Sequence, residues 1–146
     1  MPYRKILLAT DGSEQSMRAA TQAASLAKVT GADVEILAVA VLQPLYGGLQ
    51  LGAIGPDCIE GDAERAAELA VTDTATVVRK ASVEPKTVVV IAMGNAAAAI
   101  VEEAKSIEAD LIVMGSRGLG RAGTLVLGST SVQVLHITEV PVLIVR

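Results

Sequence analysis

The chain has 146 residues, a length that suits one domain with its own core. Hydrophobic residues make up 51% of it, yet it has no Phe or Trp and only 2 Tyr, so it lacks the aromatic platforms on which single-stranded nucleic acids stack. The 12 basic and 16 acidic residues give a net charge of −4, which argues against binding to a nucleic-acid backbone.

One cysteine and one histidine narrow the possibilities further. Cys58 has no second cysteine for an internal disulfide, so we expect a reducing, cytoplasmic compartment. A lone His136 excludes the common zinc sites that use several histidines. No apolar run approaches the roughly 20 residues that cross a bilayer, and the first apolar stretch is too short for a signal peptide. We expect no membrane segment.

Five short aliphatic runs predict strands that are buried on both faces. They are rich in β-branched residues, and most lack the polar alternation of a half-exposed sheet. The five runs are Lys5–Ala9, Val34–Val41, Thr87–Met93, Asp110–Met114 and Val142–Val145.

Segments with helical periodicity separate these strands. For the first helix we expect a cap at Ser13 or Asp11 and an end at Gly31. The second is expected from about Asp62 to Ala81. The shared faces are Met17, Ala20, Ala24 and Ala27 in the first helix, Ala97, Ile100, Val101 and Ala104 in the third, and Leu125, Gly128, Val132 and Leu135 in a fourth from about Leu125 to Ile137.

This alternation predicts one α/β domain over residues 1–146, with a doubly wound, five-stranded parallel sheet. Such sheets bind ligands beyond the carboxyl ends of their strands, where the strand order reverses. Residues 42–57 contain several glycines and two prolines, so we expect an irregular loop there. It would be a surface loop or, alternatively, a lid or partner contact.

The stretch from Gly115 to Ser129 carries the strongest sign of a ligand. Its glycines leave backbone N–H groups open to an anion. Gly128 and Ser129 open the last expected helix, whose N-terminus favours phosphate, and Arg117 could add positive charge. The alternative is a glycine-rich turn with structural roles only.

Three better-known motifs do not fit. Gly118, Gly120 and Gly123 spell G-x-G-x-x-G, but that fingerprint belongs after a first strand with an acidic residue about 20 positions further on. The Gly-Lys-Ser/Thr of a phosphate loop is absent. His136 lies a helix length from Ser129, too far to serve it as a base. We therefore assign no catalytic residue and no metal ligand.

The end of the first strand reads Ala9-Thr10-Asp11-Gly12-Ser13. A carboxylate here can accept a hydrogen bond from a ribose hydroxyl or a base amine, or help to hold a divalent cation near phosphates. The alternative is that Asp11 only caps the following helix.

These residues resemble the universal stress protein family. The resemblance spans essentially the whole chain and rests on residues 4–13, 109–118, 128–131 and 140–146. An ATP-binding branch of that family carries G-x2-G-x9-G-S/T, and Gly115, Gly118, Gly128 and Ser129 meet that spacing. The chain departs from the family where many members have Gly-x-Pro, because it has Gly94-Asn95-Ala96.

The resemblance implies an adenine nucleotide alpha-hydrolase-like fold with strand order 3-2-1-4-5 and ATP, with or without Mg²⁺, between strands 1 and 4. It places the adenosine end of the ligand at Ala9, Thr10, Asp11 and Val39. It places the ribose and phosphates at Gly115, Arg117, Gly118, Gly128, Ser129 and Thr130. It also implies a homodimer through the last strand, whose apolar edge (Val142, Leu143, Ile144 and Val145) would otherwise be exposed.

We therefore expect an ATP-binding stress-response protein that acts as a regulatory switch. One alternative is a dimeric signalling or interaction module of the same fold that binds no nucleotide. Another is a slow ATPase or phosphotransferase, for which the sequence offers no general base near the phosphates.

Overall fold

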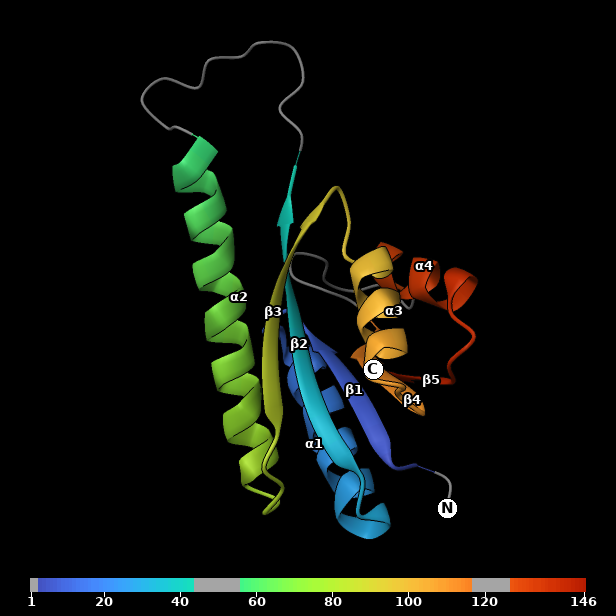
Figure 1. The fold of residues 1–146 in the computed structure, drawn as a ribbon. Helices are drawn as coiled ribbons and strands as arrows, with labels where there is room; N and C mark the ends of the chain where they lie inside the picture. Colours follow the sequence, from blue (N-terminus) through green and yellow to red (C-terminus); the bar gives the residue numbers. More distant parts are fainter. Residues whose placement is uncertain (1–2, 44–55, 117–126) are drawn as a thin grey trace.

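The computed structural model describes residues 3–43, 56–116 and 127–146. Strands and helices alternate in the expected order (Figure 1). The elements are β1 (Lys5–Thr10), α1 (Glu14–Thr30), β2 (Asp33–Leu42), α2 (Pro56–Arg79), β3 (Lys86–Met93), α3 (Ala97–Ser106), β4 (Leu111–Gly115), α4 (Ser129–Ile137) and β5 (Val142–Val145).

The five strands form one parallel sheet in the order β3-β2-β1-β4-β5, which confirms the predicted fold class and strand order. Helices α1 and α2 cover one face of the sheet, and α3 and α4 cover the other (Figure 1). Alternate residues of β1 point to opposite faces of the sheet. Ile6 and Leu8 pack with α1 and α2, whereas Leu7 and Ala9 pack with α3.

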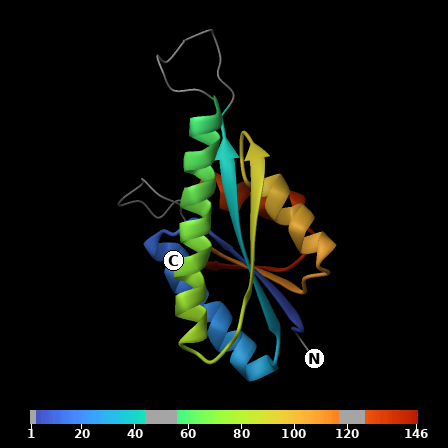
Figure 2. The ribbon, with the colours of Figure 1, turned by 60° about the vertical axis from the view of Figure 1, so that its left-hand side comes forward.

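The central strands are buried on both faces, as predicted, but the two outer strands are not. Side chains of β3 and β5 are half-buried or exposed, with Ile91 43% and Met93 64% exposed. An outer strand has a neighbour on one side only, and the ends of β2 and β3 rise alongside α2 (Figure 2). The aliphatic run of β3 therefore predicts a strand correctly but does not indicate that both of its faces are buried.

Helix α1 has the predicted ends. The Ser13 hydroxyl accepts a hydrogen bond from the Ser16 N–H, and Gly31 ends the helix in the left-handed region with φ of 75°. The buried face is built from small residues, which let the helix lie close to the sheet: Ala19, Ala20, Ala23, Ala24 and Ala27. The predicted face of α3, with Ala97, Ile100, Val101 and Ala104, is buried in full.

Helix α2 begins at Pro56, six residues before the predicted start, and ends at Arg79, two before the predicted end. The loop expected over residues 42–57 is correspondingly shorter at both ends, because Leu42 belongs to β2. A proline is well suited to the first helical position, where its missing N–H would have no partner. The rest of that expected loop, residues 44–55, lies outside the described residues.

Helix α4 presents a different face from the one predicted. Ser131 and Val134 are its buried residues, whereas Val132 and Leu135 are 36% and 44% exposed. The Ser131 hydroxyl donates to the carbonyl oxygen of Gly115 at 3.0 Å, and this contact sets the rotation of the short helix. The predicted start at Leu125 lies outside the described residues.

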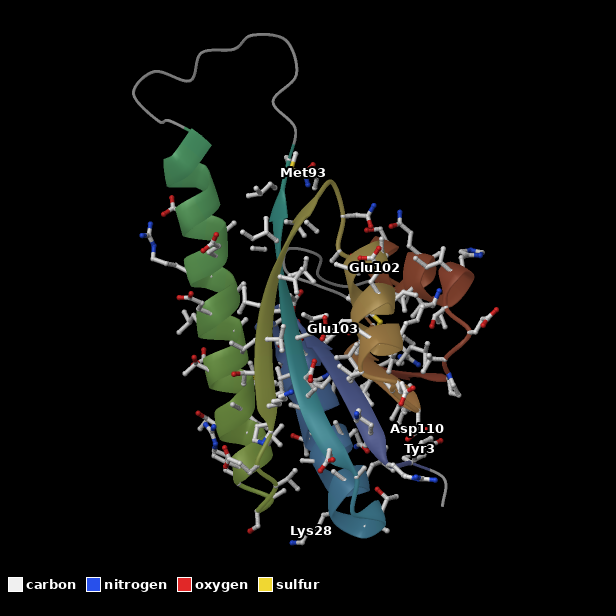
Figure 3. All side chains as sticks on the ribbon, in the orientation of Figure 1. Tyr3, Lys28, Met93, Glu102, Glu103 and Asp110 are labelled. Carbon is white, nitrogen blue, oxygen red and sulfur yellow. The ribbon has the colours of Figure 1, made fainter. Side chains whose placement is uncertain are left out.

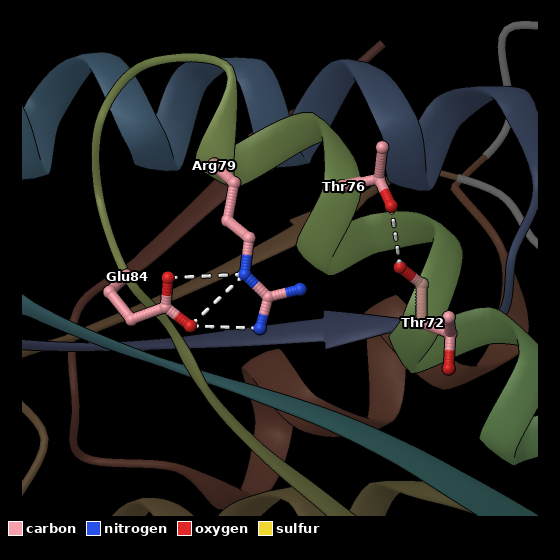
Figure 4. Close-up of polar contacts among 4 residues, drawn as sticks. All are labelled: Thr72, Thr76, Arg79 and Glu84. Atoms are coloured by element: carbon pink, nitrogen blue, oxygen red, sulfur yellow. Dashed lines mark hydrogen bonds and ion pairs between the residues drawn. The ribbon is translucent and has the colours of Figure 1, made fainter.

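Polar contacts secure the edge of the sheet where the strands begin. The Arg79 guanidinium donates to the Glu84 carboxylate at 2.8 and 3.0 Å across the turn after α2, which lowers the pKa of Glu84 (Figure 4). The Asp110 carboxylate accepts the N–H groups of Arg4 at 2.7 Å and Lys5 at 2.9 Å. Those hydrogen bonds lower the pKa of Asp110 and join the starts of β1 and β4.

Candidate functional site

The sheet divides between β1 and β4. The chain leaves β1 for β2 on one side of this boundary and leaves β4 for β5 on the other, while Ala9 and Met114 lie side by side across it. The carboxyl ends of both strands lead toward helix N-termini, those of α1 and α4. In doubly wound sheets, ligands bind at this divide.

The turn after β1 is held by Thr10. Its hydroxyl oxygen accepts the Gly12 N–H at 3.2 Å and shares a hydrogen bond of 2.8 Å with the hydroxyl of Thr74, a fully buried residue of α2. Gly12 has φ of 81°, and a Cβ there would lie 3.4 Å from the Cβ of Ala70. Helix α2 therefore packs directly against the turn that carries Asp11.

Asp11 supports this turn, although Ser13 is the residue that caps α1. One carboxylate oxygen of Asp11, Oδ1, accepts the Ser13 N–H at 2.9 Å and the Ser16 hydroxyl at 2.7 Å. The residue as a whole is exposed. These contacts orient the carboxylate at the carboxyl end of β1, where the sequence predicts a ligand contact.

Gly115 ends β4 in close contact with α1. A Cβ added here would lie 2.9 Å from the Cβ of Gln15, closer than real Cβ atoms approach, and 3.1 Å from the nitrogen of Ser16. The glycine thus lets the first turn of α1 pack against the end of β4. This packing explains Gly115 without reference to any ligand.

The N-terminus of α4 lies at the same edge. Gly128 is its N-cap in an extended conformation, and no side chain caps the helix. The Gly128 N–H donates to the carbonyl oxygen of Ser116 at 2.6 Å, so the start of α4 lies next to the end of β4. Ser129 is exposed and Thr130 half-buried in the first helical turn, whose N–H groups have no carbonyl partner inside a helix.

The structure thus brings most of the sequence-predicted site residues to one edge. Val39 lies on β2, half-buried, on the face that packs with α3, as Ala9 does. Arg117 and Gly118 lie outside the described residues. Sequence analysis missed Thr74, because it is 64 positions from Thr10 and only the packing of α2 brings the two hydroxyls together.

The remaining candidate groups lie apart from the divide or form no cluster. His136 is in the last turn of α4, seven residues or roughly 10 Å from Ser129 along the helix. Across the three described stretches no group of three or more His, Cys, Asp or Glu side chains could hold a metal ion. No helix in the same stretches is both long enough and apolar enough to span a membrane.

Comparisons with known proteins match the whole chain. It is 38% identical over 144 residues to a universal stress protein of Thermus aquaticus, an alignment that covers 99% of each chain. Universal stress protein UspA of Lactobacillus plantarum has a similar structure, with a TM-score of 0.78 and 25% identity over 100% of this chain and 99% of that one.

Two further solved structures with this fold contain adenine nucleotides. One is a universal stress protein in complex with cAMP, with a TM-score of 0.68 and 24% identity over 100% of this chain and 99% of that one. The other is a universal stress protein of Archaeoglobus fulgidus in complex with dAMP, with a TM-score of 0.67 and 22% identity over the full length of both chains. The family model of the universal stress proteins matches residues 2–146, and this chain belongs to that family.

Proposed function

We propose that this chain binds an adenine nucleotide, with ATP as the preferred ligand, at the divide between β1 and β4. The observation that carries the proposal is the convergence of two ligand-compatible features at one edge. These are the oriented carboxylate of Asp11 and the N-terminus of α4 at Gly128, which no side chain caps. Both lie where doubly wound sheets bind nucleotides.

The phosphates would lie at the N-terminus of α4. Its first N–H groups and the positive end of the helix dipole attract anions, and the hydroxyls of Ser129 and Thr130 can donate as well. Gly128 has no side chain and would leave room for a phosphate at this point. The resemblance of Gly118, Gly128 and Ser129 to the pattern of the ATP-binding branch supports ATP as the nucleotide, with Arg117 adding charge.

The adenosine would lie toward β1 and β2. Asp11 could accept from a ribose hydroxyl or the base amine, next to Ala9 and Thr10, and Val39 would contact the adenine ring. The family members solved with cAMP and dAMP support an adenine nucleotide as the class of ligand. Mg²⁺ would bind through the phosphate oxygens and its own waters, with at most one carboxylate from this edge, which suits its usual mode of binding.

One observation favours the alternative of a module that binds no nucleotide. The packing of Gly115 against Gln15 explains that glycine fully, so part of the glycine pattern has a structural cause. A direct measurement distinguishes the two functions: only the first predicts that the purified protein binds ATP.

We also propose that the protein is a cytoplasmic homodimer of a single domain, in which the β5 strands of two copies pair. The strand Val142–Val145 is one outer edge of the sheet, and neighbouring α4 exposes Val132, Leu135 and Ile137. A second copy would cover both. The single cysteine, Cys58, supports a reducing compartment.

Calorimetric titration with ATP tests the nucleotide site. In Gly128→Val, the new side chain would occupy the place where phosphate oxygens approach, and we expect binding at least tenfold weaker, about 1.4 kcal/mol. Gly61→Ala, in α2 on the other face of the sheet, is the control and should bind like the wild type. Unchanged ATP affinity in folded Gly128→Val would remove the phosphate assignment, and a wild type that binds no adenine nucleotide would favour the non-binding module.

Asp11→Ala tests which end of the nucleotide lies at β1. If Asp11 contacts the adenosine, the affinities for ATP and AMP should fall by similar factors. A loss confined to ATP with Mg²⁺ would instead place the carboxylate at the phosphates and overturn our orientation of the ligand.

A further inference from the structure

A buried glutamate lies in the sheet far from the proposed nucleotide site. Glu35 is the third residue of β2, a strand otherwise built almost wholly from aliphatic residues, and it is only 5% exposed. Its Oε1 atom is buried and has no hydrogen-bond partner among the described residues. An unpaired ionised carboxylate in such a place is costly, so its protonation and its neighbours need an explanation.

A second carboxyl group faces it from α3. The half-buried Glu103 side chain on α3 lies close enough to the Glu35 carboxyl to raise its pKa through a side-chain interaction. Figure 3 labels Glu103 and its neighbour Glu102, which is exposed. Two ionised carboxylates repel each other and have no proton to share. Such a contact therefore forms only when one of the two is protonated.

The other charged groups around Glu35 come from the adjacent strands. Lys86 of β3 lies opposite Glu35 in register, Lys5 comes from β1, and Asp33 precedes it on the same face of β2. Burial and Glu103 raise the pKa of Glu35, while the two lysines lower it, and the net effect is a raised pKa. The lysines therefore only partly offset the penalty of ionising this carboxyl.

A cavity of about 620 Å³ opens at this point, where the strands begin and α3 ends. Lys5, Glu35, Lys86 and the end of α3 at Ser106 and Ile107 line it. Water can therefore come close to Glu35 without unfolding of the sheet. A proton on Glu35 can exchange with solvent in the native protein.

We propose that Glu35 and Glu103 form a proton-binding pair that fastens the C-terminal half of α3 to the sheet and weakens this attachment when the proton leaves. A carboxyl that holds its proton more tightly when folded than when unfolded stabilises the native state most at low pH. This contribution is fully present below the ordinary glutamate pKa of 4.5 and is lost as the pH rises through the raised value. Above that raised value, the end of α3 is then held less tightly.

Urea unfolding of the full-length chain between pH 4 and 8, without nucleotide, tests the pair. Glu35→Gln keeps the shape and the hydrogen-bonding capacity but cannot ionise. For each protein, unfolding gives the equilibrium constant for folding. Between the ordinary and the raised pKa of Glu35, we expect this constant for Glu35→Gln, divided by that of the wild type, to rise by up to tenfold per pH unit. Glu103→Gln should also flatten the pH dependence, and it serves as the second variant if Glu35→Gln folds poorly.

Glu102→Gln is the matched control, because it removes the same charge from the next position of the same helix and should leave the pH dependence unchanged. Amide exchange compared at the same pH should be faster in α3 of the wild type than of Glu35→Gln at pH 7.5, and equal in α1. The proposal would be overturned if the free energy of unfolding changed with pH in the same way in the wild type, Glu35→Gln and Glu103→Gln. It would also be overturned by a pH profile that shifts on addition of Mg²⁺ or Ca²⁺, since the pair would then hold a metal ion rather than a proton.

Discussion

At the scale of single residues, glycines that read alike in the sequence have different physical roles. Gly115 is required by its neighbours, because any side chain would collide with the first turn of α1 at Gln15. Gly128 has a φ of −63°, which other residues adopt freely, so its backbone conformation does not require glycine. The close approach of a phosphate, as proposed above, would account for glycine at this position.

Replacing Gly115 with Ala should therefore destabilise the protein even without ligand. The added methyl group must displace backbone atoms of α1, and we expect a loss of about 1–3 kcal/mol in the free energy of unfolding. The same change at Gly61, where the nearest atom is 4.0 Å away at the tip of Arg65, should stabilise α2 by about 0.5–1 kcal/mol. Urea denaturation measures both, and equal effects of the two changes would show that the contact at Gly115 relaxes freely.

At the scale of elements, α2 is joined to the proposed site through its middle. The hydroxyl of the fully buried Thr74 shares a hydrogen bond of 2.8 Å with the Thr10 hydroxyl. It also lies within hydrogen-bonding distance, 2.7 Å, of the carbonyl oxygen of Ala70, one turn earlier in α2. The hydroxyls of Thr72 and Thr76 likewise donate to carbonyl oxygens of the preceding helical turn, but both residues are exposed. Figure 4 shows the contact from Thr76 to Thr72. Of these three threonines, only Thr74 connects the helix to the turn after β1.

Thr74→Val tests this connection, because valine keeps the shape of threonine and removes the hydroxyl. The buried Thr10 hydroxyl loses a partner, and we expect the free energy of unfolding to fall by about 1–2 kcal/mol. Thr76→Val removes an equivalent hydroxyl at the surface and should change stability by less than about 0.5 kcal/mol. If both variants unfold at the same urea concentration, the contact between Thr10 and Thr74 does not stabilise the turn.

At the scale of the whole molecule, the sheet has two outer strands, β3 and β5. The carbonyl oxygens of Pro141 and Val145 accept hydrogen bonds from Ile112 and Ser116, at either end of β4. Because backbone groups alternate in direction along a strand, Leu143 also points toward β4, whereas Val142 and Ile144 point away from it. A second copy would pair with the outward-pointing groups.

This geometry selects the variant that tests the dimer. Light scattering on the wild type at micromolar concentration should give a dimer mass. Ile144→Pro removes an outward N–H without breaking the pairing to β4, so a folded monomer is expected. Leu143→Pro would remove a hydrogen bond inside the sheet and should damage the fold itself. A monomeric wild type would refute the homodimer, and a dimeric Ile144→Pro would show that β5 does not form the contact.

Features that depend on local chemistry could be predicted from the sequence. Aliphatic runs located the strands to within one residue at each end, because a chain segment buried by a sheet must be apolar along its length. Ser13 and Gly31 located the ends of α1, because capping depends on the residue at that position. The alternation of elements then predicted the parallel sheet, and the family resemblance supplied its strand order.

Features that depend on residues far apart in the chain became visible only in the folded structure. Its packing buried Ser131 and Val134 of α4 in place of the predicted Val132 and Leu135, because the hydroxyl of Ser131 reaches Gly115. It left β3 partly exposed at an edge of the sheet. It also joined Thr10 to Thr74 and Glu35 to Glu103, pairs separated by more than sixty positions. No local pattern marks such contacts, because the free energy of each depends on a neighbour that only folding supplies.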